Sequence, residues 1–282
     1  MILSHNQASL QSTKKRRSTV KSALKVMKYG FFDLLRSRWI IIYTLFYLVV
    51  TSGLLYFGGD ANQAVLSTLN LVLLVVPLIS LVLGLSYFYY TRDFIELILT
   101  QPIGRSSVFL GHFAGLALPL VAAFLLGSGL PFLLAGVRQG ADWRVIASLM
   151  VAGTLVSLIF SALAFWIGLV NEERVKALGL ALAVWLGLTM IYDGLLLLFS
   201  ILMQAYPIER SLIILSLFNP IDLSRILVLL QLDTAALMGY TGAVFQRFFG
   251  SYLGILISLG SLILWTALPI YFGLRSFKKK NF

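Results

Sequence analysis

One acidic residue lies where an ionisable side chain is costly. Asp193 sits inside an apolar run that is long enough to cross a membrane, nearer to one end of that run. A charge within a bilayer needs a partner or access to water, so we expect Asp193 either to have a structural or gating role or to contact a substrate or ion. Met190 lies on roughly the same helical face as Asp193, and a thioether beside a carboxylate can bind copper. Methionines in membrane helices more often fill packing gaps.

The rest of the chain lacks the residue patterns of common active sites. It has no Gly-x-x-x-x-Gly-Lys-Ser/Thr loop to hold nucleotide phosphates, and without cysteine it can form neither a disulfide nor a thiolate metal site. His5 and His112 are the two histidines, which leaves no cluster for a metal and no Ser-His-acid arrangement. Glu172 and Glu173 are sequence neighbours that share no helical face, so we interpret them as a solvated loop. We predict a non-catalytic chain that binds no metal or cofactor itself.

Composition indicates a membrane protein. The 282 residues are 59% hydrophobic and only 12% charged, and a bilayer span needs about 20 apolar residues. We predict an all-α, polytopic membrane protein with six spans: Trp39–Phe57, Val65–Tyr90, Val108–Ala135, Val145–Val170, Ala177–Met203 and Ser251–Gly273. Pro119 and Pro131 leave two alternatives for the third span, either unbroken or broken near Gly127-Ser128-Gly129 into a span and a re-entrant or interfacial piece.

The basic residues are distributed asymmetrically around these spans. On the six-span reading, 17 of the 22 Lys and Arg fall on one side of the membrane. Short loops rich in Lys and Arg stay cytoplasmic, which predicts that both termini are cytoplasmic. A nucleic-acid-binding surface explains the charge of +11 poorly, because the basic residues flank apolar spans.

The segment before the first span has the pattern of an amphipathic helix. Residues 1–19 are polar and predicted to be disordered. Residues 20–38 place apolar side chains at steps of three and four, opposite a basic face. The apolar positions are Val20, Ala23, Leu24, Met27, Phe31, Leu34 and Leu35. We expect this elbow helix to lie in the membrane interface with its lysines near anionic lipid, either as a simple anchor or in contact with a partner.

A second short amphipathic segment lies between the second and third spans. Its predicted apolar face is Phe94, Leu97 and Ile98, and its solvent-facing charges are Arg92, Asp93 and Glu96. Pro102 ends this helix, and Ser106 is expected to cap the third span. The result is a helix of about two turns across the membrane plane, which is either a tight connection or a lever for a partner that moves.

The stretch 204–250 is an insertion on the outer side. It contains an apolar run too short to span, followed by Asn219-Pro220 and a helical pattern in which Asp222 suits the first turn. We predict helices that lie against the outer leaflet or dip into it. Asn219, Pro220, Asp222 and Arg225 either dock an outer partner or belong to a cap on the bundle.

Small residues suggest how helices assemble. Gly111-x-x-x-Gly115 and Gly250-x-x-x-Gly254 permit close helix contacts within or between subunits. Six spans make a small transport unit, so a pathway at a two-fold interface requires a homodimer. The predicted organisation is the tail 1–19, the elbow 20–38, a six-span domain 39–275 with the insertion 204–250, and a basic tail 276–282.

These motifs resemble a known family. The run Asp93-Phe-Ile-Glu-Leu-Ile-Leu-Thr-Gln-Pro-Ile-Gly-Arg-Ser is similar to the loop of type 2 ABC exporter permeases, where a Glu-Leu-Leu-Leu-x-x-Pro-x-x-Arg pattern forms the coupling helix. The elbow, the six spans and Phe218-Asn-Pro-Ile-Asp-Leu-Ser-Arg225 resemble one branch, the NosY-like permeases that help to mature the copper sites of nitrous oxide reductase. The resemblance covers about residues 20 to 275. One departure is Arg92-Asp93-Phe94, where many relatives carry Glu-x-Gly-Thr.

The resemblance implies a permease subunit in a bacterial inner membrane that works with two separate ATPase subunits, which bind ATP and Mg²⁺. The residues expected to couple to them are Arg92, Asp93, Glu96, Gln101, Pro102 and Arg105. It also implies a periplasmic β-helix protein as the outer partner. The substrate stays open between copper, a sulfur species, a lipid, or none. The alternative function is a membrane receptor or scaffold that docks proteins on both sides without transport.

Overall fold

The computed structural model describes residues 24–58, 60–100, 103–136, 140, 142–203, 209–231 and 252–280. Within these ranges every regular element is a helix, which confirms the all-α prediction. The predicted disordered tail, Gln101, Pro102 and Gly250 lie outside the described residues.

Among the residues that the structure describes, six helices are long and apolar enough to cross a membrane, in agreement with the sequence. They are Arg38–Phe57, Ala61–Tyr90, Arg105–Gly136, Trp143–Val170, Arg174–Leu202 and Gly254–Lys279. Most boundaries lie within a few residues of those predicted. The sixth span reaches six residues further, into the basic tail, since nothing in Leu274 to Lys279 stops a helix.

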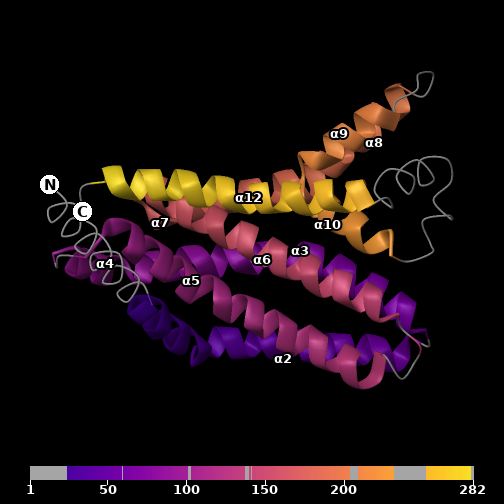
Figure 1. Cartoon of the computed structure of the whole chain (residues 1–282), viewed down its shortest axis with the longest axis horizontal. Coiled ribbons are helices and arrows are strands. Elements are labelled where there is room, and N and C mark those ends of the chain that lie inside the picture. The colour runs from indigo at the N-terminus through magenta and orange to yellow at the C-terminus, as the bar shows by residue number, and fades with distance from the viewer. Residues whose placement is uncertain are drawn as a thin grey trace, which may run out of the picture.

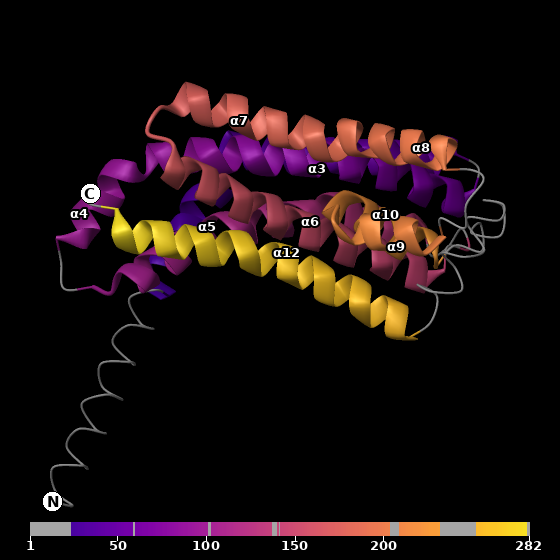
Figure 2. The same ribbon diagram turned by 90° about the horizontal axis from the view of Figure 1, so that it is seen from above.

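The elements follow one another as short and long helices. After a helix at residues 24–35 come α2 (Arg38–Phe57), α3 (Ala61–Tyr90), α4 (Arg92–Leu99), α5 (Arg105–Phe124), the π-helices η1 (Leu125–Gly129) and η2 (Phe132–Gly136), α6 (Trp143–Val170), α7 (Arg174–Leu186), the π-helix η3 (Gly187–Ile191), α8 (Tyr192–Leu202), α9 (Glu209–Leu217), α10 (Pro220–Leu229) and α12 (Tyr252–Lys279). The long helices run side by side (Figures 1 and 2). We call the end of the bundle that holds α4 the α4 end, and the opposite end, toward which α10 lies, the α10 end.

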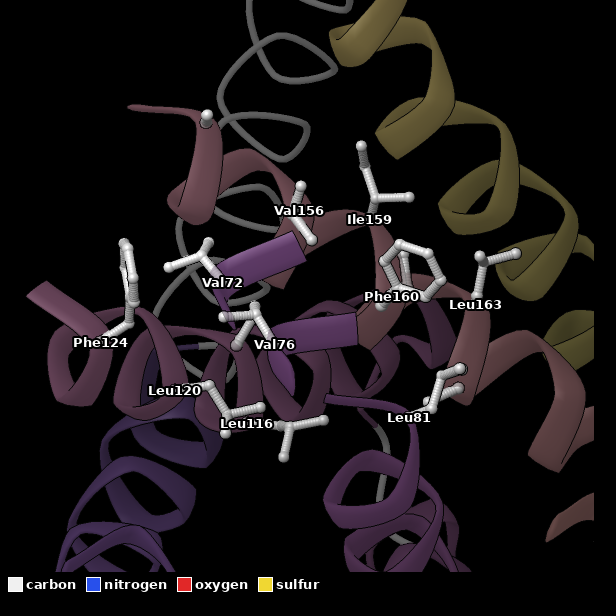
Figure 3. Close-up of a cluster of buried hydrophobic side chains, with 14 of the residues drawn as sticks. Val72, Val76, Leu81, Leu116, Leu120, Phe124, Val156, Ile159, Phe160 and Leu163 are labelled. Carbon is white, nitrogen blue, oxygen red and sulfur yellow. The ribbon is translucent and has the colours of Figure 1, made fainter. Parts of the chain in front are cut away.

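The core lies between α3, α5 and α6. Figure 3 shows Val76 of α3, Leu120 of α5 and Phe160 of α6 gathered in one buried cluster. In the second, third and fourth spans 56–61% of the most apolar window is buried, whereas in the fifth span none of it is. The fifth span therefore lies on the outside of the bundle, with its apolar surface open to lipid or to another protein.

Side-chain caps begin two of the spans. Asp60 accepts a hydrogen bond from the backbone N–H of Asn62 at 3.0 Å, and Asp142 accepts one from that of Arg144 at 2.9 Å. Each cap satisfies one of the free amides at a helix start. The expectation that Ser106 caps the third span was wrong. That helix begins one residue earlier, at Arg105, and Gly104 in the cap position has no side chain to accept a bond.

The third span is unbroken, and π turns take the place of a break. Arg105–Gly136 passes as one span through η1 and η2, with Pro131 between them. Proline has no N–H to give to the preceding turn, and wider turns let the helix continue around that gap. In η1 the backbone comes close to α2, because a Cβ on Gly127 would lie 2.7 Å from the carbonyl oxygen of Thr44. Gly127 thus permits a backbone contact that any larger residue would block.

We predict that Gly127→Ala destabilises the protein. The added methyl group would push apart two helix backbones, and overpacking of this kind costs about 1–3 kcal/mol. Gly53→Ala on α2 is the matched control, because a Cβ on Gly53 would meet nothing within 4 Å. Thermal unfolding in detergent should give a lower midpoint for Gly127→Ala than for Gly53→Ala. Equal midpoints would show that the contact between α2 and η1 is not tight.

Candidate functional site

The α4 end carries a short helix on the surface of the bundle. α4 has eight residues and follows α3 after Thr91, whose hydroxyl donates to the carbonyl of Tyr87 at 2.8 Å. Ile95 and Ile98 are the buried residues of α4. The predicted apolar face of Phe94, Leu97 and Ile98 was therefore wrong at two positions, since Leu97 is 67% exposed and Phe94 is 40% exposed. The buried face is rotated toward Ile95, because contact with α3 and α5 decides which residues of so short a helix are covered.

The charged side chains of α4 remain accessible. Arg92 and Glu96 form an i, i+4 ion pair at 3.4 Å with partly exposed side chains, and Asp93 is exposed. An exposed pair of this kind contributes only about 0.3–0.5 kcal/mol to stability. The three charges are thus available for contact with another protein.

The helix at residues 24–35 packs against α4 and α5. The ring of Tyr29 stacks on that of Phe94, with 5.6 Å between centroids. A Cβ on Gly115 would lie 3.3 Å from the Cα of Gly30, so the two helix backbones nearly touch there. Gly115 of the predicted small-residue motif therefore serves a contact within the subunit. The placement of the helix at residues 24–35 in a membrane interface remains a prediction.

A clamp of charged side chains joins the ends of three spans. Arg105 donates from Nη1 to the carbonyl oxygens of Lys278 at 2.8 Å and Lys280 at 3.1 Å. Lys280 donates from Nζ to the carbonyl of Leu169 at 3.1 Å. Partial burial lowers the pKa of the Lys280 ammonium, and the positive charge of Arg92 lowers it further. Arg105, predicted to contact an ATPase, thus also fastens the start of α5 to the end of α12, and these carbonyl contacts have no signal in the sequence.

The loop between α6 and α7 lies at the same end. Tyr89 of α3 donates to the carbonyl of Asn171 at 2.7 Å. Glu173 pairs with Lys176 at 2.8 Å, with both side chains mostly exposed, and Glu172 is exposed. This arrangement agrees with the interpretation of the two glutamates as part of a solvated loop.

A sharply bent pair of helices lies toward the α10 end. α9 and α10 meet at 113°, in the geometry of a re-entrant loop or a broken span. The last carbonyls of α9 find donors on two neighbouring spans: Tyr192 donates to Leu215, and the indole N–H of Trp265 donates to Leu217 at 3.2 Å. Carbonyls at a helix end have no partner within the helix and need one from elsewhere in a membrane.

The turn between α9 and α10 is held by Asn219. Its side-chain oxygen accepts from the N–H of Ile221 at 3.0 Å, and its amide donates to the carbonyl of Leu188 in η3 at 2.9 Å. Pro220 occupies the first helical position, where a missing N–H costs nothing. The Asn-Pro pair thereby caps α10 and fastens it to the fifth span.

An ion-pair triad joins α8 to α10. Nη1 of Arg225 lies 2.9 Å from Oδ2 of Asp193 and 3.2 Å from Oδ1 of Asp222. Asp222 is buried, whereas Asp193 and Arg225 are each about one-third exposed. We call Asp193, Asp222 and Arg225 the triad. Asp193 thus has a partner, as a charge within a span requires, while the identity of that partner, Arg225, could not be read from the sequence.

The remaining predicted site residues have different surroundings. Asn219, Pro220 and Asp222 are buried, so among the four residues predicted to dock an outer partner only Arg225 has an exposed portion. Met190 is 57% exposed. Within the described part of the chain, no three His, Cys, Asp or Glu side chains are grouped to hold a metal ion.

Comparison with known proteins agrees with this architecture. Residues 24–282 match the model of a family described as ABC-2 family transporter protein. A curated relative from Stutzerimonas stutzeri, named probable ABC transporter permease protein NosY, is 30% identical over 264 residues, which cover 86% of this chain and 90% of that protein. A relative of the same name from Pseudomonas aeruginosa is 31% identical over 227 residues, covering 73% of this chain and 81% of that protein. With a matching family model over nearly its whole length, six spans and NosY permeases among its relatives, this chain belongs to the ABC-2 family of transporter permeases.

Proposed function

We propose that this chain is the membrane subunit of an ATP-driven transporter and that α4 is where it receives force from an ATPase subunit. The observation that carries the proposal is the position of α4: a short helix with accessible charges, fixed to the spans by its buried face, in a member of an ABC transporter family. The chain has no phosphate-binding loop of the Gly-x-x-x-x-Gly-Lys-Ser/Thr type, so the ATP and Mg²⁺ belong to the partner.

The contacts at the α4 end explain how a push on α4 would reach the spans. Ile95 and Ile98 bury α4 against the bundle, and the stack of Tyr29 on Phe94 ties it to the helix at residues 24–35. An aromatic pair of this kind contributes about 0.5–1.5 kcal/mol beyond its buried area. Arg105 carries the connection on to the end of α12. A partner that displaces α4 therefore moves several spans together.

At the other end, we propose that the triad is a latch between the fifth span and α10. α8 is the second half of the fifth span, whose apolar window is unburied. α10 follows the 113° bend after α9. Charge pairing and the hydrogen bond from Asn219 to Leu188 are directional contacts that fix their relative position. Opening of the latch would let the fifth span move relative to α10.

We further propose a homodimer, because the fifth span has an entirely unburied apolar window that a second copy could cover. Within this proposal both termini are cytoplasmic and the α4 end faces the ATPase. The finer assignment to nitrous oxide reductase maturation, with a periplasmic β-helix partner, rests on the motif resemblance and on the names of the relatives. With Asn219, Pro220 and Asp222 buried, such a partner would have to bind other residues on the outer side.

The orientation can be tested by labelling, since the chain has no cysteine of its own. A membrane-impermeant maleimide added to intact cells should leave Lys279→Cys unlabelled and should label Arg144→Cys, because the two exposed positions flank spans at opposite ends. The expectation follows from the excess of Lys and Arg at the α4 end. Labelling of Lys279→Cys from outside would invert the proposed orientation.

Reversal of charge on α4 should uncouple the ATPase. Glu96→Lys places a cation beside Arg92 on the accessible face, and we expect ATP hydrolysis by the reconstituted complex to fall about tenfold, the effect of losing about 1.4 kcal/mol at the contact. The matched control is Glu172→Lys, an identical change in the exposed loop at the same end. If Glu96→Lys co-purifies with the ATPase and the complex hydrolyses ATP normally, α4 is only a connection between two spans.

The triad predicts an order of severity for its variants. Arg225→Gln leaves two nearby carboxylates without their shared cation, whereas Asp193→Asn leaves Arg225 paired with Asp222. We expect Arg225→Gln to lower stability by about 2 kcal/mol and Asp193→Asn by less than about 1 kcal/mol. Thermal unfolding in detergent at neutral pH measures both. Equal losses, or a larger loss for Asp193→Asn, would contradict the triad as the source of the effect.

A further inference from the structure

A lateral groove opens between α2, α3 and the start of α7. It has a volume of about 540 Å³. Its long walls are apolar, formed by α2 from Trp39 to Phe46 and by α3 from Val75 to Leu83. Its polar end is formed by Ser86 and Arg174. The groove is therefore amphipathic along its length, with its single cationic side chain at one end.

The groove is about as long as one membrane leaflet is thick. From Val75 to Ser86 the α3 helix advances about 16 Å at 1.5 Å per residue, roughly half of a hydrocarbon core that is about 30 Å thick. Arg174 is the first residue of α7 and Trp39 lies in the first turn of α2, so the polar end is at the α4 end. Trp39 is 57% exposed there, as tryptophans at a membrane–water boundary commonly are.

The guanidinium of Arg174 has N–H donors available for a ligand. Its Nη2 donates to the hydroxyl of Ser86 at 3.2 Å. In the described ranges no carboxylate pairs with it, because the adjacent Glu173 is paired with Lys176. A guanidinium offers five N–H donors in a planar fork that matches the oxygens of a phosphate. A cation without a counter-ion at the boundary of an apolar groove favours the binding of an anion that also has an apolar part.

We propose that this groove binds a glycerophospholipid from the leaflet at the α4 end. One acyl chain lies along the apolar walls of α2 and α3, and the phosphate accepts hydrogen bonds from Arg174. A helix from a second copy would fill the apolar walls but would leave the guanidinium without an anion. A phospholipid satisfies both parts of the groove. The proposal does not depend on ATP coupling or on the orientation of the chain in the membrane.

Native mass spectrometry of the purified full chain tests the site. Phosphatidylglycerol with one palmitoyl and one oleoyl chain is added stepwise in a mild detergent. We expect one saturable site per chain, whose affinity falls about tenfold in Arg174→Gln through loss of the charge-assisted contact. Val82→Trp, which fills the groove between its walls, should abolish that site.

Two matched variants control for charge and bulk. Lys279→Gln removes an exposed cation at the same end of the bundle, away from the groove lining, and Val151→Trp adds the same ring at an exposed valine of α6. Both should bind the lipid as the unmodified chain does. Arg174 is exposed, so Arg174→Gln remains informative even if Val82→Trp does not fold.

Two results would overturn the proposal. One is unchanged lipid affinity in Arg174→Gln. The other is efficient disulfide cross-linking of Val82→Cys between two chains in native membranes, which would show that a second copy covers the groove. Failure of either kind leaves the proposed coupling through α4 unaffected, because Glu96 and Arg92 are not part of the groove lining.

Discussion

The need to pair every backbone polar group in the absence of water governs the α10 end of this protein. A bent pair of helices inside a membrane exposes the last carbonyls of one helix and the first amides of the next. Here Tyr192 and Trp265 supply donors to the end of α9, and Asn219 caps the start of α10. Tyr192 and Trp265 come from different spans, so the bend forms where the fifth and sixth spans meet. The position of α10 against the bundle follows from this requirement.

The two ends of the bundle use charge differently. At the α4 end the pairs Arg92–Glu96 and Glu173–Lys176 are exposed, and they contribute only tenths of a kcal/mol. Apolar contacts and bonds to backbone carbonyls therefore hold that end together, which leaves its charges available for recognition. Toward the α10 end Arg225 lies between two carboxylates, of which that of Asp222 is buried. There the charges join two helices, and we expect the loss of the shared cation to be more costly than the loss of one anion.

The sequence predicted the features that depend on local pattern. Apolar runs of membrane length gave the six spans, and the Arg92 to Ile98 segment gave a helix in the right place. The side that α4 buries was predicted incorrectly, because two turns of helix carry too weak a periodicity to reveal which face the neighbouring spans cover. Asp193 was identified as a charge within a span, but its partner is 32 residues away in the chain and belongs to another helix. The carbonyl contacts of Arg105 and Lys280 depend on tertiary structure alone.

The fifth span connects the two ends along the outside of the bundle, and its buried residues, Ala177 and Ala181, lie in its first half, α7. It begins in the loop beside α3 at the α4 end, passes through the π turns of η3, and reaches Asp193. Its apolar window is unburied, so packing resists its movement less than it resists rearrangement of the interlocked spans α3, α5 and α6. Asn219 binds the carbonyl of Leu188 within η3, directly before the triad. In the proposed mechanism, force applied at the α4 end would therefore act on the triad most readily through this span, because the hydrogen bond to Leu188 and the ion pair of Asp193 are the polar contacts that hold it to α10.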